Sequence, residues 1–147
     1  MTRLAATSLA CLVALVAPAF ADWRFDPGLG GSGYAVGEGS NDIGMVLDCG
    51  NGGLPAVSIE GHDPGADTEI FVISVTGHPE ELWSASCDRA SCLLDLESME
   101  RARRFLGQVR SGSEAQIGLY RRGSLSVMSL RGSGRAMAAS VDRACPL

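Results

Sequence analysis

Alternating apolar and polar residues along the middle of the chain predict an antiparallel β-rich fold. Between Ile43 and Cys49 every second side chain is apolar, which is the period of a strand with one buried face. Asn51-Gly52-Gly53 follows and favours a hairpin into the next strand. Further strands are expected over residues 34–36, 54–59, 69–75 as a central strand, 82–86, 115–120 and 125–130.

Two helices are expected among these strands. From Leu96 to Val109 the apolar residues Met99, Ala102 and Leu106 recur at helical spacing, and Gly112 follows as a stop signal. A short helix over residues 135–144 is expected to begin at a Ser133 cap. Since tight turns join most strands, the class is mostly β or α+β: an antiparallel, sandwich-like domain of about seven strands with two short helices. Trp23 and Phe25 are the expected anchors of the glycine-rich segment over residues 22–39.

The first 21 residues have the pattern of a secretory signal peptide. Arg3 precedes an apolar run, Pro18 interrupts it, and small residues lead to a cleavage site after Ala21. The run is too short for a membrane span, so the expected mature form is one exported domain, residues 22–147, without a transmembrane segment. Export to an oxidising compartment makes disulfides the expected state of the cysteines.

Four cysteines remain in the expected mature chain: Cys49, Cys87, Cys92 and Cys145. Four cysteines can form two disulfides in three different ways. A hairpin-like turn between Cys87 and Cys92 would bring that pair together and leave Cys49 to meet Cys145. Trp83 is expected to cover the first of these bonds. No metal site is expected, because C-x4-C is not a usual zinc spacing and the histidines have no matching one.

Charge is distributed unevenly along a chain whose formal net charge is -5 at pH 7. Residues 22–100 hold fifteen acidic residues against two arginines, whereas residues 101–147 hold nine arginines against two acidic residues. One interpretation is that the arginines pair with the acids across the fold. The other is one anion-binding face, for lipid headgroups, lipopolysaccharide or an acidic envelope protein, made of Arg101, Arg103, Arg104, Arg110, Arg121 and Arg122.

The acidic part of the chain allows a rival function, the inhibition of a cationic secreted enzyme. Its carboxylates are Glu60, Asp63, Asp67, Glu69, Glu80 and Glu81. Nucleic acid is not an expected partner, because the chain is acidic and only 5% of its residues are aromatic.

No catalytic residue or cofactor is predicted. Residues 28–33 spell G-x-G-x-x-G, yet no apolar strand precedes them and no helix follows. His62 and His78 lie in polar, turn-like stretches, where a solvated histidine is the usual case, and no G-x-S-x-G motif is present. A small hydrolase with an unrecognised site is kept as a third hypothesis.

Several loose motifs resemble those of small alphaproteobacterial envelope proteins of the invasion associated locus B family. They are the early Trp23, a strand ending in cysteine, the C-x4-C element, a helix followed by a strand pair, and a closing stretch over residues 129–136. The last part is also similar to the ends of type VI secretion accessory proteins. The resemblance implies a periplasmic β-rich accessory protein of a Gram-negative bacterium. The function expected is therefore that of a non-enzymatic envelope accessory or binding protein that acts through its charged faces.

Overall fold

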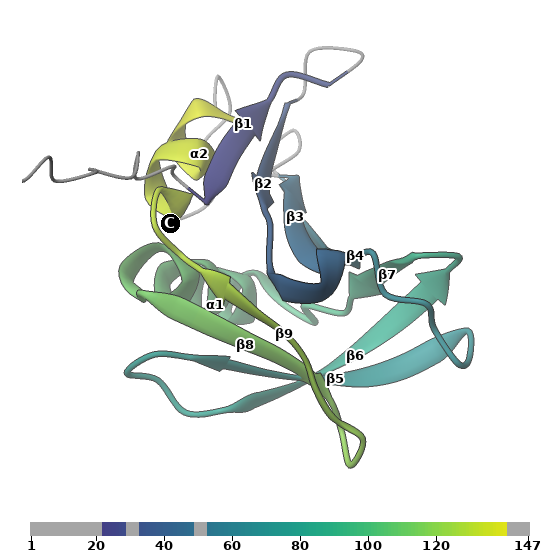
Figure 1. Cartoon of the computed structure of the whole chain (residues 1–147). Coiled ribbons are helices and arrows are strands. Elements are labelled where there is room, and N and C mark those ends of the chain that lie inside the picture. The colour runs from purple at the N-terminus through teal and green to yellow at the C-terminus, as the bar shows by residue number, and fades with distance from the viewer. Residues whose placement is uncertain (1–21, 29–32, 49–52, 141–147) are drawn as a thin grey trace, which may run out of the picture.

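Nine antiparallel strands form one continuous sheet in the part of the chain that this computed structural model describes, residues 22–28, 33–48 and 53–140 (Figure 1). Their order across the sheet is β1-β2-β3-β4-β7-β6-β5-β8-β9. The strands are β1 (Trp23–Asp26), β2 (Tyr34–Gly37), β3 (Gly44–Asp48), β4 (Ala56–Glu60), β5 (Thr68–Val75), β6 (Glu81–Asp88), β7 (Ser91–Leu94), β8 (Glu114–Leu119) and β9 (Gly123–Ser129). The 3-10 helix η1 (Ser40–Asp42) and the helices α1 (Met99–Ser111) and α2 (Ser133–Ala139) accompany them.

The predicted class, mostly antiparallel β with two helices, is confirmed. All seven predicted strands are present, and their ends lie within two residues of those expected. β5 is an interior strand between β6 and β8, in agreement with the prediction that it is not at an edge. The two additional strands, β1 and β7, have only four residues each. The two separate sheets of a sandwich are not confirmed, because the strands are hydrogen-bonded in one unbroken order.

The core lies between the inner face of the sheet and α1. On β5 the inward residues Phe71, Ile73 and Val75 are buried, and the residues between them face outward, as the two-residue period requires. Trp83 on β6 packs against Phe105 of α1 with ring centroids 4.8 Å apart. Of the predicted anchors, Trp23 is buried, whereas Phe25 is 39% exposed and lies outside the core. The Phe25 ring lies against Gly33 of the glycine-rich segment.

Both helices begin at other residues than predicted. The chain turns before α1, because the Glu97 amide bonds to the Asp95 side chain and Glu97 has a positive φ of 57°. The Ser98 hydroxyl then accepts a bond from the Arg101 amide and caps the helix. Gly112 ends α1 as expected.

Ser133 is not the cap of α2, which is a correction. Gly132 takes the N-cap position with a φ of 85°, a left-handed conformation that glycine adopts without strain. Ser133 is instead the first helical residue, and its buried hydroxyl donates to the Val109 carbonyl at 2.8 Å. The bond joins α2 to the end of α1. The predicted extension of this helix past residue 140 lies outside the described residues.

The free edge of β9 is covered by the N-terminal part of the chain. The Val127 amide donates to the Ser40 hydroxyl at 2.9 Å, and the Asn41 side chain donates to the Leu125 carbonyl at 2.8 Å. The Trp23 indole N–H donates to the Ser129 carbonyl at 2.9 Å. We call this set of contacts the seam. Side chains thus occupy backbone groups that an edge strand would otherwise present to another strand.

Helix α2 lies beside β1 and β2, and in Figure 1 the yellow helix is next to the purple strand. Within the described ranges, neither α1 nor α2 has the length and apolar character needed to cross a membrane.

Candidate functional site

The outer face of the sheet, the side that α1 does not cover, is uncharged in its middle. The pairing register places Ile70 opposite Ser84 and Val72 between Leu82 and Gly118. Large apolar side chains there are unusually exposed: Ile70 (45%), Leu82 (47%), Tyr120 (42%) and Val127 (40%). Clustered exposed apolar residues on one surface indicate a place where the protein contacts something else.

A groove of about 400 Å³ runs along this face over β5, β8 and the start of β9. We call it the outer groove. Its middle is lined by Val72, Ser74, Gln116, Gly118, Tyr120 and Ser124, and Glu80 and Arg121 also line it. The volume lies near the lower end of the range for small-molecule pockets.

The groove is open in its middle because Gly118 has no side chain. The register of β8 and β9 shifts between Ile117 and Gly118, which is an irregularity of the β-bulge type. A Cβ atom at Gly118 would lie 2.8 Å from the Gly123 carbonyl oxygen, so a larger residue would require the backbone to move. Glycine at this position therefore permits both the bulge and the open floor.

Opposite charges stand at the two ends of the outer groove. Glu80 directly precedes Glu81, which pairs with Ile73, so Glu80 lies beside the Ser74 end of β5. Arg121 follows Tyr120, whose amide donates to the Ile70 carbonyl at 2.9 Å. Ser74 is four positions after Ile70, which corresponds to about 14 Å along a strand.

Neither charge is neutralised by the described residues. Glu80 is exposed and has no hydrogen bond or ion pair to any of them. Arg121 has none either, and its guanidinium carbon lies 5.0 Å from the centroid of the Tyr120 ring in a cation–π contact. Both groups are therefore available to a ligand.

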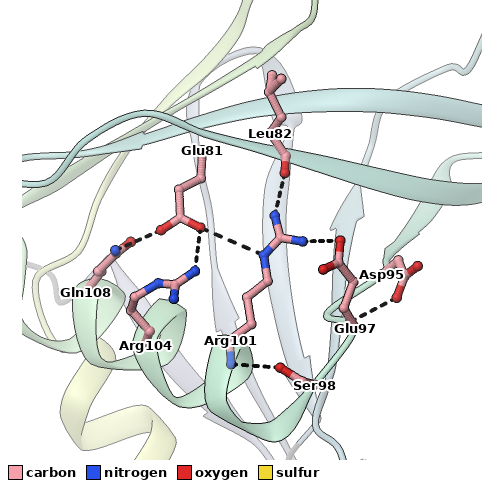
Figure 2. Close-up of polar contacts among 8 residues, drawn as sticks. All are labelled: Glu81, Leu82, Asp95, Glu97, Ser98, Arg101, Arg104 and Gln108. Atoms are coloured by element: carbon pink, nitrogen blue, oxygen red, sulfur yellow. Dashed lines mark hydrogen bonds and ion pairs between the residues drawn. The ribbon is translucent and has the colours of Figure 1, made fainter.

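Arg101, by contrast, is part of the internal packing (Figure 2). Its side chain is only 19% exposed, and its guanidinium carbon lies 4.0 Å from the centroid of the Trp83 ring. Nη2 donates to the Leu82 carbonyl at 2.7 Å, and the same guanidinium pairs with Glu97 and Glu81. The prediction that Arg101 lines the exposed side of the helix is wrong, because this side chain bends back onto β6.

The Glu81 carboxylate contacts three polar side chains of α1, those of Arg101, Arg104 and Gln108 (Figure 2). Arg104 approaches it at 3.4 Å and Gln108 donates to it at 3.0 Å. Arg103 and Arg110 are exposed and make no ion pair with the described residues. Two of the four arginines of the predicted basic helix face are thus balanced by an acid from the acidic part of the chain, residues 22–100.

A second buried polar cluster lies at the other end of β5. His62 Nε2 and Glu69 Oε2 are 2.5 Å apart, and both side chains are buried. The Gly65 amide donates to Glu69 at 2.9 Å, and Arg122 lies 3.4 Å from it. Burial raises the pKa of Glu69, but the bonds from Gly65 and His62 and the charges of His62 and Arg122 outweigh it, so the pKa lies below its ordinary value.

The six predicted arginines therefore fall into two places. Four are on α1, where Arg101 and Arg104 meet at Glu81 beside one end of β5 and Arg103 and Arg110 are exposed. Arg121 and Arg122 follow β8 at the other end of β5, next to Ile70 and Glu69. Of the acidic residues considered for an inhibitor surface, Glu69 and Glu81 are used within the fold. Glu60 accepts bonds from the Ser58 and Ser91 hydroxyls, while Asp63 and Asp67 are exposed.

Cys87 and Cys92 are bonded to each other across β6 and β7, as predicted. A Glu69 oxygen lies within 4.8 Å of both sulfurs, and because the sulfurs are joined they do not offer two thiolates to a metal. Trp83, which was expected to cover this bond, packs against Phe105 and Arg101 and lies opposite Phe71 of β5. Cys49 and Cys145 lie outside the described residues, so their predicted pairing stays a prediction.

The two histidines differ in their surroundings. His78 is exposed in the turn after β5, where its amide donates to the Val75 carbonyl at 2.9 Å. His62 is not the solvated loop residue that was predicted, since it is buried against Glu69 and its ring meets Phe71 at 5.7 Å.

Sequence reasoning named Glu80 only as one acid among several and missed Gln116, Gly118 and Tyr120. The available signal was the alternation along β5 and β8, which assigns residues of odd and even number to opposite faces of each strand. Comparison with known proteins finds no match for the chain among protein-family models, curated proteins or solved structures.

Proposed function

We propose that this is a non-enzymatic binding protein of the bacterial envelope and that the outer groove is its ligand site. The observation that carries the proposal is the pair of opposite, unpartnered charges, Glu80 and Arg121, at the ends of one groove on a face whose middle is uncharged. Charged groups at defined places in a groove fix the orientation of a ligand.

The paired arginines of α1 support this choice of surface. Arg101 and Arg104 already have carboxylate partners, and an anionic ligand would have to replace them or add to them. Arg121 has no such competitor within the described residues. Binding through the groove therefore needs no internal ion pair to break.

Export is the second part of the proposal. It rests on the signal-like first 21 residues, and the Cys87–Cys92 bond is compatible with an oxidising compartment. The role as an envelope accessory protein rests on the resemblance described above.

The test is a ligand screen by two-dimensional NMR on the protein purified from the exported fraction. Short peptides, neutral and acidic oligosaccharides and anionic lipid vesicles are titrated separately. We expect one class to shift the amide signals of Val72, Gln116 and Ser124, and to lose this effect in Glu80→Gln and Arg121→Gln. Shifts confined to α1, above all with anionic vesicles, would refute the groove and favour the arginine surface.

The matched controls are Glu100→Gln and Arg103→Gln. Both residues are exposed on α1 without an ion pair to the described residues, so each change removes the same charge at a distance from the groove. Binding that these controls weaken as much as the groove variants would indicate a general effect of net charge.

A further inference from the structure

We infer that the ligand of the outer groove is a short extended peptide of about four residues with both ends free, its ammonium group at Glu80 and its carboxylate at Arg121. The inference rests on the proposed function and names the chemical class of the ligand.

The first argument is charge. A purely anionic ligand would face the free carboxylate of Glu80, a purely cationic one would face Arg121, and a neutral one would leave both groups unmatched. A ligand with one positive and one negative end satisfies both. The order of the charges also sets its direction, from the Ser74 end of β5 towards the Ile70 end.

The second argument is length. The two ends of the groove are about 14 Å apart along β5. An extended peptide advances about 3.3 Å per residue, so four residues span this distance and two do not. A free amino acid covers only about one residue of this length.

The third argument is the polar lining between the charges. A bound peptide brings backbone amides that lose water and need hydrogen-bond partners. Ser74, Gln116 and Ser124 offer two hydroxyls and one side-chain amide along the groove, and Tyr120 offers a phenol. Since the sheet's own backbone groups are engaged between strands, these side chains are the donors and acceptors on that surface.

The fourth argument concerns ligand side chains. The groove floor is formed by Val72 and the bare backbone of Gly118, and the volume is about 400 Å³. A backbone of four residues uses much of that space, so small side chains such as alanine fit best. Larger ones would point away from the floor towards Ile70 or Leu82.

The experiment measures binding of four forms of tetra-alanine by calorimetry: both ends free, N-acetylated, C-amidated, and blocked at both ends. We expect the free peptide to bind, each single block to weaken it about tenfold, and the doubly blocked peptide to weaken it further. In a series from dialanine to hexa-alanine, the affinity should rise up to four residues and should not increase further with longer peptides.

Two variants assign each end of the peptide. In Glu80→Gln, N-acetylation of the peptide should no longer weaken binding, whereas C-amidation should still weaken it. In Arg121→Gln, C-amidation should no longer weaken binding, whereas N-acetylation should still weaken it. Equal binding of free and blocked peptides, or the same response of both variants to both blocks, would overturn the inference. Unchanged Tm values of the two variants, whose side chains are exposed, verify that they fold.

The outcome also separates this inference from the proposed function. If an oligosaccharide shifts the amide signals of Val72, Gln116 and Ser124 in the NMR screen and tetra-alanine does not, the inference of a peptide ligand is wrong, but the groove is still the binding site. If no ligand class perturbs the groove, both are wrong.

Discussion

The guanidinium carbon of Arg101 lies 4.0 Å from the centroid of the Trp83 ring, and the ring itself is fully buried. An arginine thus covers a fully buried tryptophan of the core. Its aliphatic stem and planar head both pack, while the polar atoms reach Leu82, Glu81 and Glu97.

Arg101→Ala should therefore destabilise the protein by about 1–3 kcal/mol, because it uncovers Trp83 and removes a bond to a backbone carbonyl. Arg103→Ala, two residues along the same helix and exposed, is the control and should change the free energy of unfolding by less than about 0.5 kcal/mol. Urea denaturation followed by tryptophan fluorescence measures both. Equal effects of the two changes would contradict the packing role.

The lowered pKa of Glu69 predicts a loss of stability in acid. The folded protein holds this carboxyl in its charged form more strongly than the unfolded chain does. The stabilisation is complete above the ordinary glutamate pKa of about 4.3 and is lost as the pH falls through the lower, folded-state pKa.

Glu69→Gln should be less stable than the native protein at pH 6, by about 1–3 kcal/mol, and the gap should narrow as the pH falls. Denaturation curves at a series of pH values test this. Asp63→Asn, an exposed acid near the same loop, serves as the comparison and should leave the pH dependence unchanged. A constant gap at all pH values would show that Glu69 acts only by its shape and hydrogen bonds.

Removal of the Cys87–Cys92 bond should cost about 2 kcal/mol, because it closes a short loop between adjacent strands. The double change Cys87→Ala and Cys92→Ala is the direct test, measured by thermal denaturation. A single alanine change is a poorer measurement, because it leaves the other cysteine as an unpaired thiol, and Cys92 is fully buried. An unchanged Tm would show that the β6–β7 pairing itself holds this hairpin.

The seam predicts a local effect of Asn41→Ala and Ser40→Ala. Each removes one side-chain bond to the free edge of β9, at Leu125 or Val127. Stability should fall by about 1 kcal/mol per change, and exchange of the Val127 amide with deuterium should accelerate in Ser40→Ala. The Ile117 amide, on β8, is the internal reference. Equal acceleration at both amides would indicate global unfolding rather than an opened seam.

Local patterns were sufficient for most of the fold because each strand with one buried face carries its own alternation. Two strands escaped prediction. β1 runs directly into a glycine-rich segment, and β7 follows β6 after the tight turn between Cys87 and Cys92, so its residues were predicted as part of that turn. The hairpin at Cys87 was accessible because its two cysteines are near in sequence.

The candidate site was less accessible, for a physical reason. Glu80 and Arg121 share a groove only because β5 pairs with β8, and no local signal specifies that pairing. The inward turn of Arg101 was missed because a helical projection gives the direction of a side chain and not its reach.

The bond from Trp23 to Ser129 spans 106 residues, and it has a consequence for the order of assembly. A chain that emerges with its N-terminus first cannot complete this contact until nearly all of it has arrived, so the opening strands wait for the closing ones. Contacts between such distant segments slow folding, because a long loop must be ordered before they form. Until β9 has formed, the indole N–H of Trp23 lacks its Ser129 partner, so the last strand of the sheet completes the fixation of the first.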